Sequence, residues 1–157
     1  MWPLPMESVH PLLVHFPIAL LMTALLFDGL ALKRPQLHRV ALWNLSLGTL
    51  GAGAAVWSGY QAADIAKHSF EIHQVMELHR KLGIATLVLG SLVVIWRLWK
   101  RDQLSPRFRL LTWLIMLAMT GTLGYGAHLG GRLVYEFGVG GPFGKSDASP
   151  THEHHHH

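Results

Sequence analysis

Histidine is the residue type with the clearest chemical use in this sequence. Four histidines lie at the ends of long apolar segments: His10, His15, His79 and His128. Neutral imidazole is a common ligand of haem iron, copper and zinc. Cysteine is absent, which excludes thiolate ligation and covalent c-type haem attachment within this chain. The residue types therefore indicate haem or metal binding by imidazole.

The elements that position these histidines are four apolar segments. Half of all residues are hydrophobic and 14% are charged, whereas a soluble domain carries roughly 25% charged residues. A membrane-spanning helix needs about 20 mainly apolar residues, and four segments qualify, at about 9–32, 40–63, 78–99 and 109–128. Lipid requires each segment to satisfy its own backbone, and short links make neighbouring helices antiparallel. The sequence predicts an all-α, integral membrane, up-down four-helix bundle.

The distribution of charge predicts how the bundle is oriented. The links after the first and third segments are rich in lysine and arginine, with Asp102 as the one acid among them, while seven of the other eight acids lie at the opposite end. The positive-inside rule then places these links in the cytoplasm. We therefore expect a protein of the bacterial inner membrane with both termini, and the four histidines, on the outer (periplasmic) side. The basic residues form no stripe with interleaved aromatics, so nucleic acid is not an expected partner.

The predicted domain covers residues 1–140. After the fourth segment, residues 129–140 form a glycine-punctuated stretch too short to span a membrane, which we interpret either as an outer cap over the histidines or as a plain interfacial turn. Residues 141–157 have the composition of a flexible tail. The tail ends in a histidine run typical of an expression tag, so it is excluded from the site.

Haem b fits the four histidines, because two imidazoles can hold its iron without cysteine. The first and third helices of an up-down bundle lie diagonally, so His15 with His79 is the first expected axial pair. His128 with His10 is a second pair, or His128 replaces either partner, giving one or two haems. His10 and His15 are five residues apart, about 140° around an ideal helix, and should not serve one site unless Pro17 reshapes that turn.

Small residues near the histidines have two interpretations. Stripes at helical spacing leave room for a planar macrocycle, or they serve close helix–helix packing. The haem propionates are expected to meet Arg80, Lys81 or Arg132 at the outer surface. The stripes comprise Gly48, Gly51, Ala52, Ala55 and Gly59 in the second segment, Gly83, Thr86 and Gly90 in the third, and Gly121 and Gly124 in the fourth.

Asp28 is an acid within the first segment, close to its inner end. A carboxylate in a membrane is costly and needs a partner. We expect Asp28 to pair with Arg97, or to hydrogen-bond Asn44 and Trp43. Proton uptake for a quinone site is the functional alternative.

Three stretches resemble a bacterial membrane protein family known as domain of unknown function 2231. They are HPLLVHFPIAL at residues 10–20 with Phe27-Asp28 following, HRKLG at 79–83 and HLGGRLVY at 128–135, so the resemblance covers about residues 8–140. It implies a four-helix membrane domain with histidines at these positions. Relatives joined to Rieske or cytochrome c modules imply a role in electron transfer.

The leading hypothesis is a membrane b-type cytochrome. It would pass electrons between a separate outer-side redox protein and quinone or a larger respiratory complex. Two alternatives stay open, namely copper or zinc binding by the same imidazoles and a non-catalytic structural subunit of a respiratory complex. No nucleophile–base–acid arrangement or phosphate-binding glycine loop is present, so an electron-transfer protein or subunit is favoured over a stand-alone enzyme.

Overall fold

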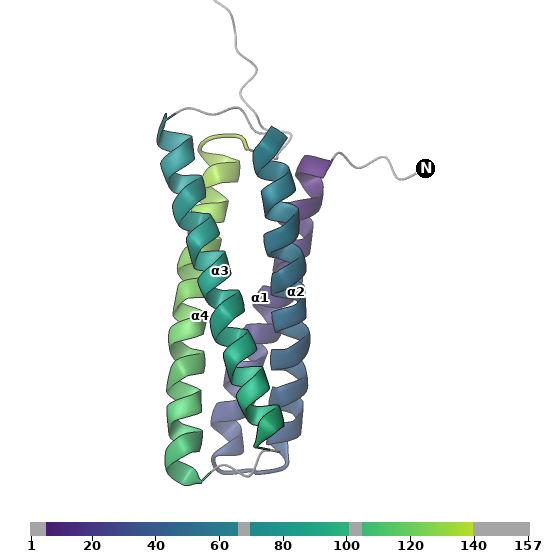
Figure 1. Cartoon of the computed structure of the whole chain (residues 1–157), viewed down its shortest axis with the longest axis vertical. Coiled ribbons are helices and arrows are strands. Elements are labelled where there is room, and N and C mark those ends of the chain that lie inside the picture. The colour runs from purple at the N-terminus through teal and green to yellow at the C-terminus, as the bar shows by residue number, and fades with distance from the viewer. Residues whose placement is uncertain (1–5, 66–69, 101–104, 140–157) are drawn as a thin grey trace, which may run out of the picture.

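Four long helices make up the protein. The computed structural model describes residues 6–65, 70–100 and 105–139. Within them the chain runs up and down through four antiparallel helices, so that α1 begins and α4 ends at the same end of the bundle (Figure 1). The helices are α1 (Met6–Ala31), α2 (Leu37–Ile65), α3 (Phe70–Trp99) and α4 (Pro106–Tyr135). The predicted all-α four-helix bundle is confirmed.

The helices are longer than the predicted spans, most clearly at the histidine end. There α3 begins at Phe70, and α4 continues to Tyr135 through the residues expected to start a separate cap. The glycine pair Gly130-Gly131 does not break α4, and Gly130 packs directly against His79. A turn follows α4, and the predicted tail at 141–157 lies outside the described residues.

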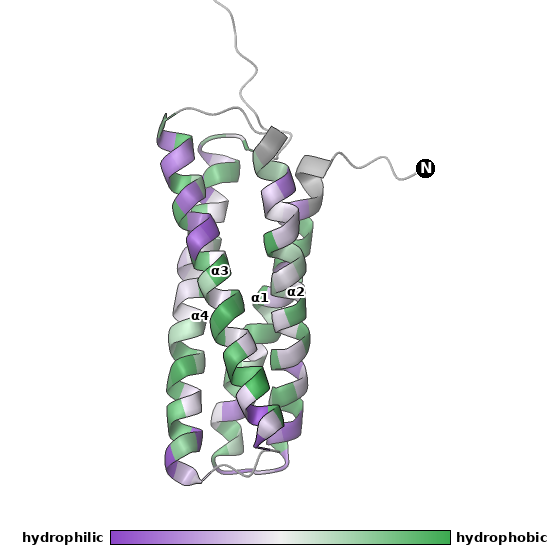
Figure 2. Ribbon diagram, viewed as in Figure 1, coloured by the Kyte–Doolittle hydropathy of each residue, from purple (hydrophilic) through white to green (hydrophobic). Residues whose placement is uncertain are grey.

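The surface of the bundle is apolar. Each of the four helices is long and apolar enough to cross a membrane. Large side chains such as Leu50, Trp57 and Ile95 are more than 60% exposed, and hydrophilic residues collect towards the helix ends (Figure 2). A soluble monomer rarely exposes so large an apolar surface to water. The lipid bilayer is therefore the environment of these helices.

Each helix packs against two neighbours. Among the described residues, α1 contacts α2 and α4, while α3 contacts α2 and α4, so α1 and α3 are diagonal. The closest seam is α1–α2 and the loosest is α1–α4. The centre of the bundle is filled by a core of Leu21, Ala24, Leu45, Val93, Met116 and Met119.

The small-residue stripes fall into two groups. Those of α2 and α3 face inward and allow close packing: a Cβ on Gly48 would lie 2.8 Å from Leu21 Cδ2, and one on Gly90 would lie 2.7 Å from Thr49 Oγ1. The stripe of α4 faces outward, because a Cβ on Gly121 or Gly124 would meet nothing within 4 Å. Close packing thus accounts for the α2 stripe and for Gly90.

We predict that Gly48→Ala destabilises the bundle by about 1–3 kcal/mol, since the buried Leu21 side chain cannot move away from the added methyl group. Gly121→Ala is the matched control and should leave stability unchanged or slightly raised. Thermal or denaturant unfolding in detergent measures both variants. Equal effects at the two positions would contradict the inward and outward assignment.

Candidate functional site

Two histidines from diagonal helices meet at the end of the bundle where α1 begins. The ring centroids of His10, on α1, and His79, on α3, lie 6.1 Å apart, and their planes are almost perpendicular at 85°. Both side chains are half-buried. We call His10 and His79 the histidine pair.

Hydrogen bonds fix the tautomer of each neutral ring. His79 Nδ1 lies 2.8 Å from the carbonyl oxygen of Gly126, which can only accept, so Nδ1 carries the proton. His10 Nδ1 lies 2.9 Å from Ser58 Oγ, and that hydroxyl already donates to the Ala55 carbonyl at 3.0 Å. His10 Nδ1 is therefore also the donor. In both rings the lone pair that could bind a metal is left on Nε2.

Glycines seat the two rings from the flanking helices. A Cβ on Gly59 of α2 would lie 3.0 Å from His10 Cε1, and one on Gly130 of α4 would lie 3.1 Å from His79 Cε1. Any side chain at either position would press on an imidazole. All four helices thus contribute to the site: α1 and α3 supply the rings, and α2 and α4 supply glycines that lie against them.

The other two predicted histidine ligands lie elsewhere. His15 is exposed, and its Nδ1 donates to the Pro11 carbonyl of its own helix at 2.7 Å. His128 is exposed on α4 beside the Tyr125 ring, at 6.4 Å between centroids. The structure therefore does not bring together the expected pairs His15 with His79 and His10 with His128. For His15 the reason is angular, because it sits about 140° around α1 from His10, which is the histidine that faces the bundle axis. His128 lies on the outward face of α4, together with Gly121 and Gly124.

The predicted propionate partners lie near the histidine pair and are already ion-paired. Arg80 and Lys81 both contact Glu77, and the Arg80 guanidinium also lies 5.5 Å from the Tyr60 ring centre. Arg132 bonds Glu136 at 2.9 Å. In each ion pair the two residues are about one helical turn apart on the same helix and partly exposed, so the pairing is weak. Among the described residues no group of three or more histidines and carboxylates could hold a metal ion.

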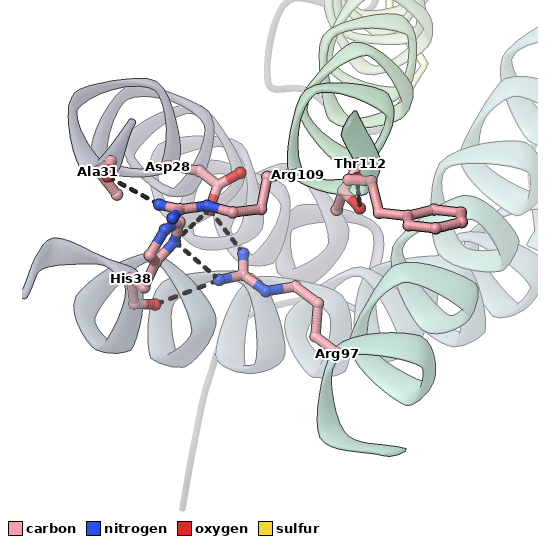
Figure 3. Close-up of polar contacts among 7 residues, drawn as sticks. Asp28, Ala31, His38, Arg97, Arg109 and Thr112 are labelled. Atoms are coloured by element: carbon pink, nitrogen blue, oxygen red, sulfur yellow. Dashed lines mark hydrogen bonds and ion pairs between the residues drawn. The ribbon is translucent and has the colours of Figure 1, made fainter. Parts of the chain in front are cut away.

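The histidine pair is one polar layer of the bundle. A second polar layer lies at the opposite end, and it also joins α1 to α3. Asp28 Oδ1 lies 2.8 Å from Arg97 Nη1, with the two side chains 5% and 1% exposed. The predicted Asp28–Arg97 pair is confirmed. His38, at the start of α2, adds its Nδ1 at 3.2 Å from the same carboxylate oxygen, and its carbonyl lies 3.4 Å from Arg97 Nη2 (Figure 3). We call Asp28, His38 and Arg97 the charged cluster.

The fourth helix is tied to this end by Arg109, which sequence reasoning did not place in the cluster's surroundings. Arg109 Nη2 donates to the carbonyl of Ala31, the last residue of α1, at 2.9 Å (Figure 3). A cation on the terminal carbonyl of a helix is favoured by the helix dipole. Polar contacts therefore connect all four helices at this end.

One spacing, found twice in the sequence, indicates that the two polar layers belong together. His10 and Asp28 are 18 residues apart, and so are His79 and Arg97. Eighteen residues are about five helical turns, so each helix presents its two polar residues on one face. Two helices with the same interval can pair at both ends without twisting.

Comparison of the sequence with known protein families agrees with this architecture. The family model described as "Predicted membrane protein (DUF2231)" matches residues 6–141, which takes in every described helix. The chain belongs to the DUF2231 family. No curated protein and no solved structure matches this DUF2231 chain.

We predict that Arg97→Gln destabilises the bundle by about 3–5 kcal/mol, because the Asp28 carboxylate is left buried without its cation. Joint replacement by Asp28→Leu and Arg97→Met should recover most of that loss. Arg80→Gln removes a surface ion pair and should cost less than about 1 kcal/mol. Unfolding in detergent measures all three. If the free-energy losses of the two substitutions simply add in the double variant, with no recovery, the two charges are not coupled.

Proposed function

We propose that this DUF2231 protein is a membrane b-type cytochrome whose haem is held by His10 and His79. The observation that carries the proposal is the histidine pair itself: two imidazoles from diagonal helices, both with Nε2 lone pairs, 6.1 Å apart between ring centres. Imidazole nitrogens bind transition metals at about 2 Å, so two rings on one ion have centres roughly 6 Å apart. The separation supports ligation of a shared ion.

The number of ligands favours haem over a bare metal ion. A porphyrin supplies four nitrogens and leaves two axial positions on its iron, which two imidazoles complete. Zinc takes about four protein ligands, and the described residues offer no third histidine or carboxylate for such a set. Copper or zinc is therefore an outcome that the experiment distinguishes and not a second proposal.

The surrounding residues have defined roles in this function. Ser58 and the Gly126 carbonyl hold the Nδ1–H groups, which fixes each ring and raises the basicity of its Nε2. Gly59 and Gly130 keep side chains away from the edges of the rings. Arg80, Lys81 and Arg132 provide cations near the pair that can exchange a surface carboxylate for a propionate. Haem, when bound, supplies a reversible one-electron redox centre.

The position of the pair suits electron exchange at one end of the bundle. His79 lies nine residues inside α3, about 13 Å from its first residue. At the other end the only described histidine, His38, is held by the charged cluster, so we propose one haem and not two. The charge distribution supports a periplasmic histidine end in the bacterial inner membrane. A separate redox protein would then meet the histidine end, with quinone or a respiratory complex as the other electron partner.

We predict that the purified protein carries about one haem b, and that His10→Ala and His79→Ala each lose it or leave the iron with one imidazole. His15→Ala is the matched control on α1 and should retain the full spectrum. A reduced-minus-oxidised visible spectrum and a pyridine haemochrome assay measure the outcome. The proteins should lack residues 152–157, because a histidine run binds haem and metals adventitiously.

Three results would overturn the proposal. The first is a wild-type protein without a Soret band after expression with haem supplied. The second is equal loss of haem from His15→Ala and His10→Ala. The third is stoichiometric copper or zinc without porphyrin, which would assign the histidine pair to metal handling.

A further inference from the structure

A groove between α1 and α4 lies at the end of the bundle opposite the histidine pair. Trp113 of α4 forms one wall and five residues of α1 form the other, enclosing about 350 Å³. Three of the α1 residues are about half exposed: Met22 at 55%, Leu26 at 58% and Leu30 at 48%. The groove thus lies on the loosest seam of the bundle and opens to lipid. Its lining is Met22, Leu25, Leu26, Gly29, Leu30 and Trp113.

The end of the groove beside the last turn of α1, which we call its foot, is positively charged. Arg109 lies one turn before Trp113 on α4 and reaches across to the last carbonyl of α1. Among the described residues Arg109 has no carboxylate partner, and the acid of this end, Asp28, is paired with Arg97. The turn that follows α1 adds two exposed cations, Lys33 and Arg34. The foot therefore has positive charge that the described acids do not neutralise.

Two hydrogen-bond donors at this place lack an acceptor. Arg109 Nε and Trp113 Nε1 are buried and have no partner among the described residues. Trp113 Nε1 rests against Gly29, where a Cβ would lie 2.9 Å away. A buried donor without an acceptor is costly. Because both groups donate, the missing partner is an oxygen acceptor.

We propose that the α1–α4 groove binds one anionic phospholipid, with an acyl chain along the α1 face from Leu30 to Met22 and its phosphate at Arg109. The depth agrees with this occupant. Gly29 and Arg109 lie within one turn of their helix ends, at headgroup level, and Met22 lies about 10 Å deeper, among acyl chains. Phosphate is the bidentate acceptor that guanidinium prefers. A zwitterionic lipid would bring an ammonium group towards Lys33, Arg34 and Arg109 and is disfavoured.

The test uses tryptophan quenching, because Trp113 lines the groove. The protein is reconstituted in phosphatidylcholine with brominated-chain phosphatidylglycerol, and in the reverse mixture. The Trp113 contribution is the difference between wild type and Trp113→Phe. We expect this component to be quenched at least about fivefold more effectively by the anionic lipid, the preference that one cation near the surface supplies. Arg109→Gln should remove most of the preference, leaving the smaller part that Lys33 and Arg34 supply, while Arg109→Lys should retain more of it.

Arg107→Gln is the matched control, since Arg107 is an exposed cation on the same helix. It should keep the preference of the wild type. Helicity by circular dichroism confirms that each variant is folded. Equal quenching by the two lipids in the wild type would reduce the groove to ordinary lipid contact and overturn the proposal. So would an equal loss of preference in Arg107→Gln, or displacement of the brominated lipid by an isoprenoid quinone.

Discussion

The buried ion pair between Asp28 and Arg97 is the contact on which the arrangement of both ends depends. It joins α1 and α3, which lie diagonally across the bundle. Neither charge can be left unpaired in the buried interior of the bundle, so the two helices can slide or rotate little without a large cost. Because His10 and His79 each lie five turns from a member of this pair, the register that joins the charges also turns both imidazoles towards the axis.

The two polar layers differ in what they leave available. In the charged cluster the carboxylate, the guanidinium and His38 are engaged with one another, so the layer acts as an anchor. In the histidine pair the Nδ1–H groups are engaged and the Nε2 atoms keep their lone pairs. Glycine backbones beside the rings replace the side chains that would otherwise fill the space. Ligand chemistry is therefore favoured at one end and structural cohesion at the other.

The sequence predicted the four spans from their apolar length, and it named Arg97 as one of two expected kinds of partner for Asp28, because a carboxylate within a span needs a compensating group. It was insufficient for the histidine partners. The diagonal arrangement of the first and third helices was predicted, but it does not say which histidine of α1 faces α3. The rotation of α1 decides that, and this rotation depends on packing against the glycines of α2. His38 was missed because it precedes the predicted second span, while α2 begins at Leu37. The α4 glycines likewise need tertiary packing to show which of them face inward.

The most direct test of the central claim is the electron paramagnetic resonance spectrum of the oxidised protein. The orientation of the two axial rings sets the splitting of the iron d orbitals: perpendicular rings leave two of them nearly degenerate, and parallel rings separate them. If the histidine pair holds haem as proposed, with the His10 and His79 planes at 85°, the low-spin ferric iron should give one strongly shifted g value and no well-resolved rhombic set. A rhombic low-spin spectrum, high-spin iron or the absence of haem would contradict the account.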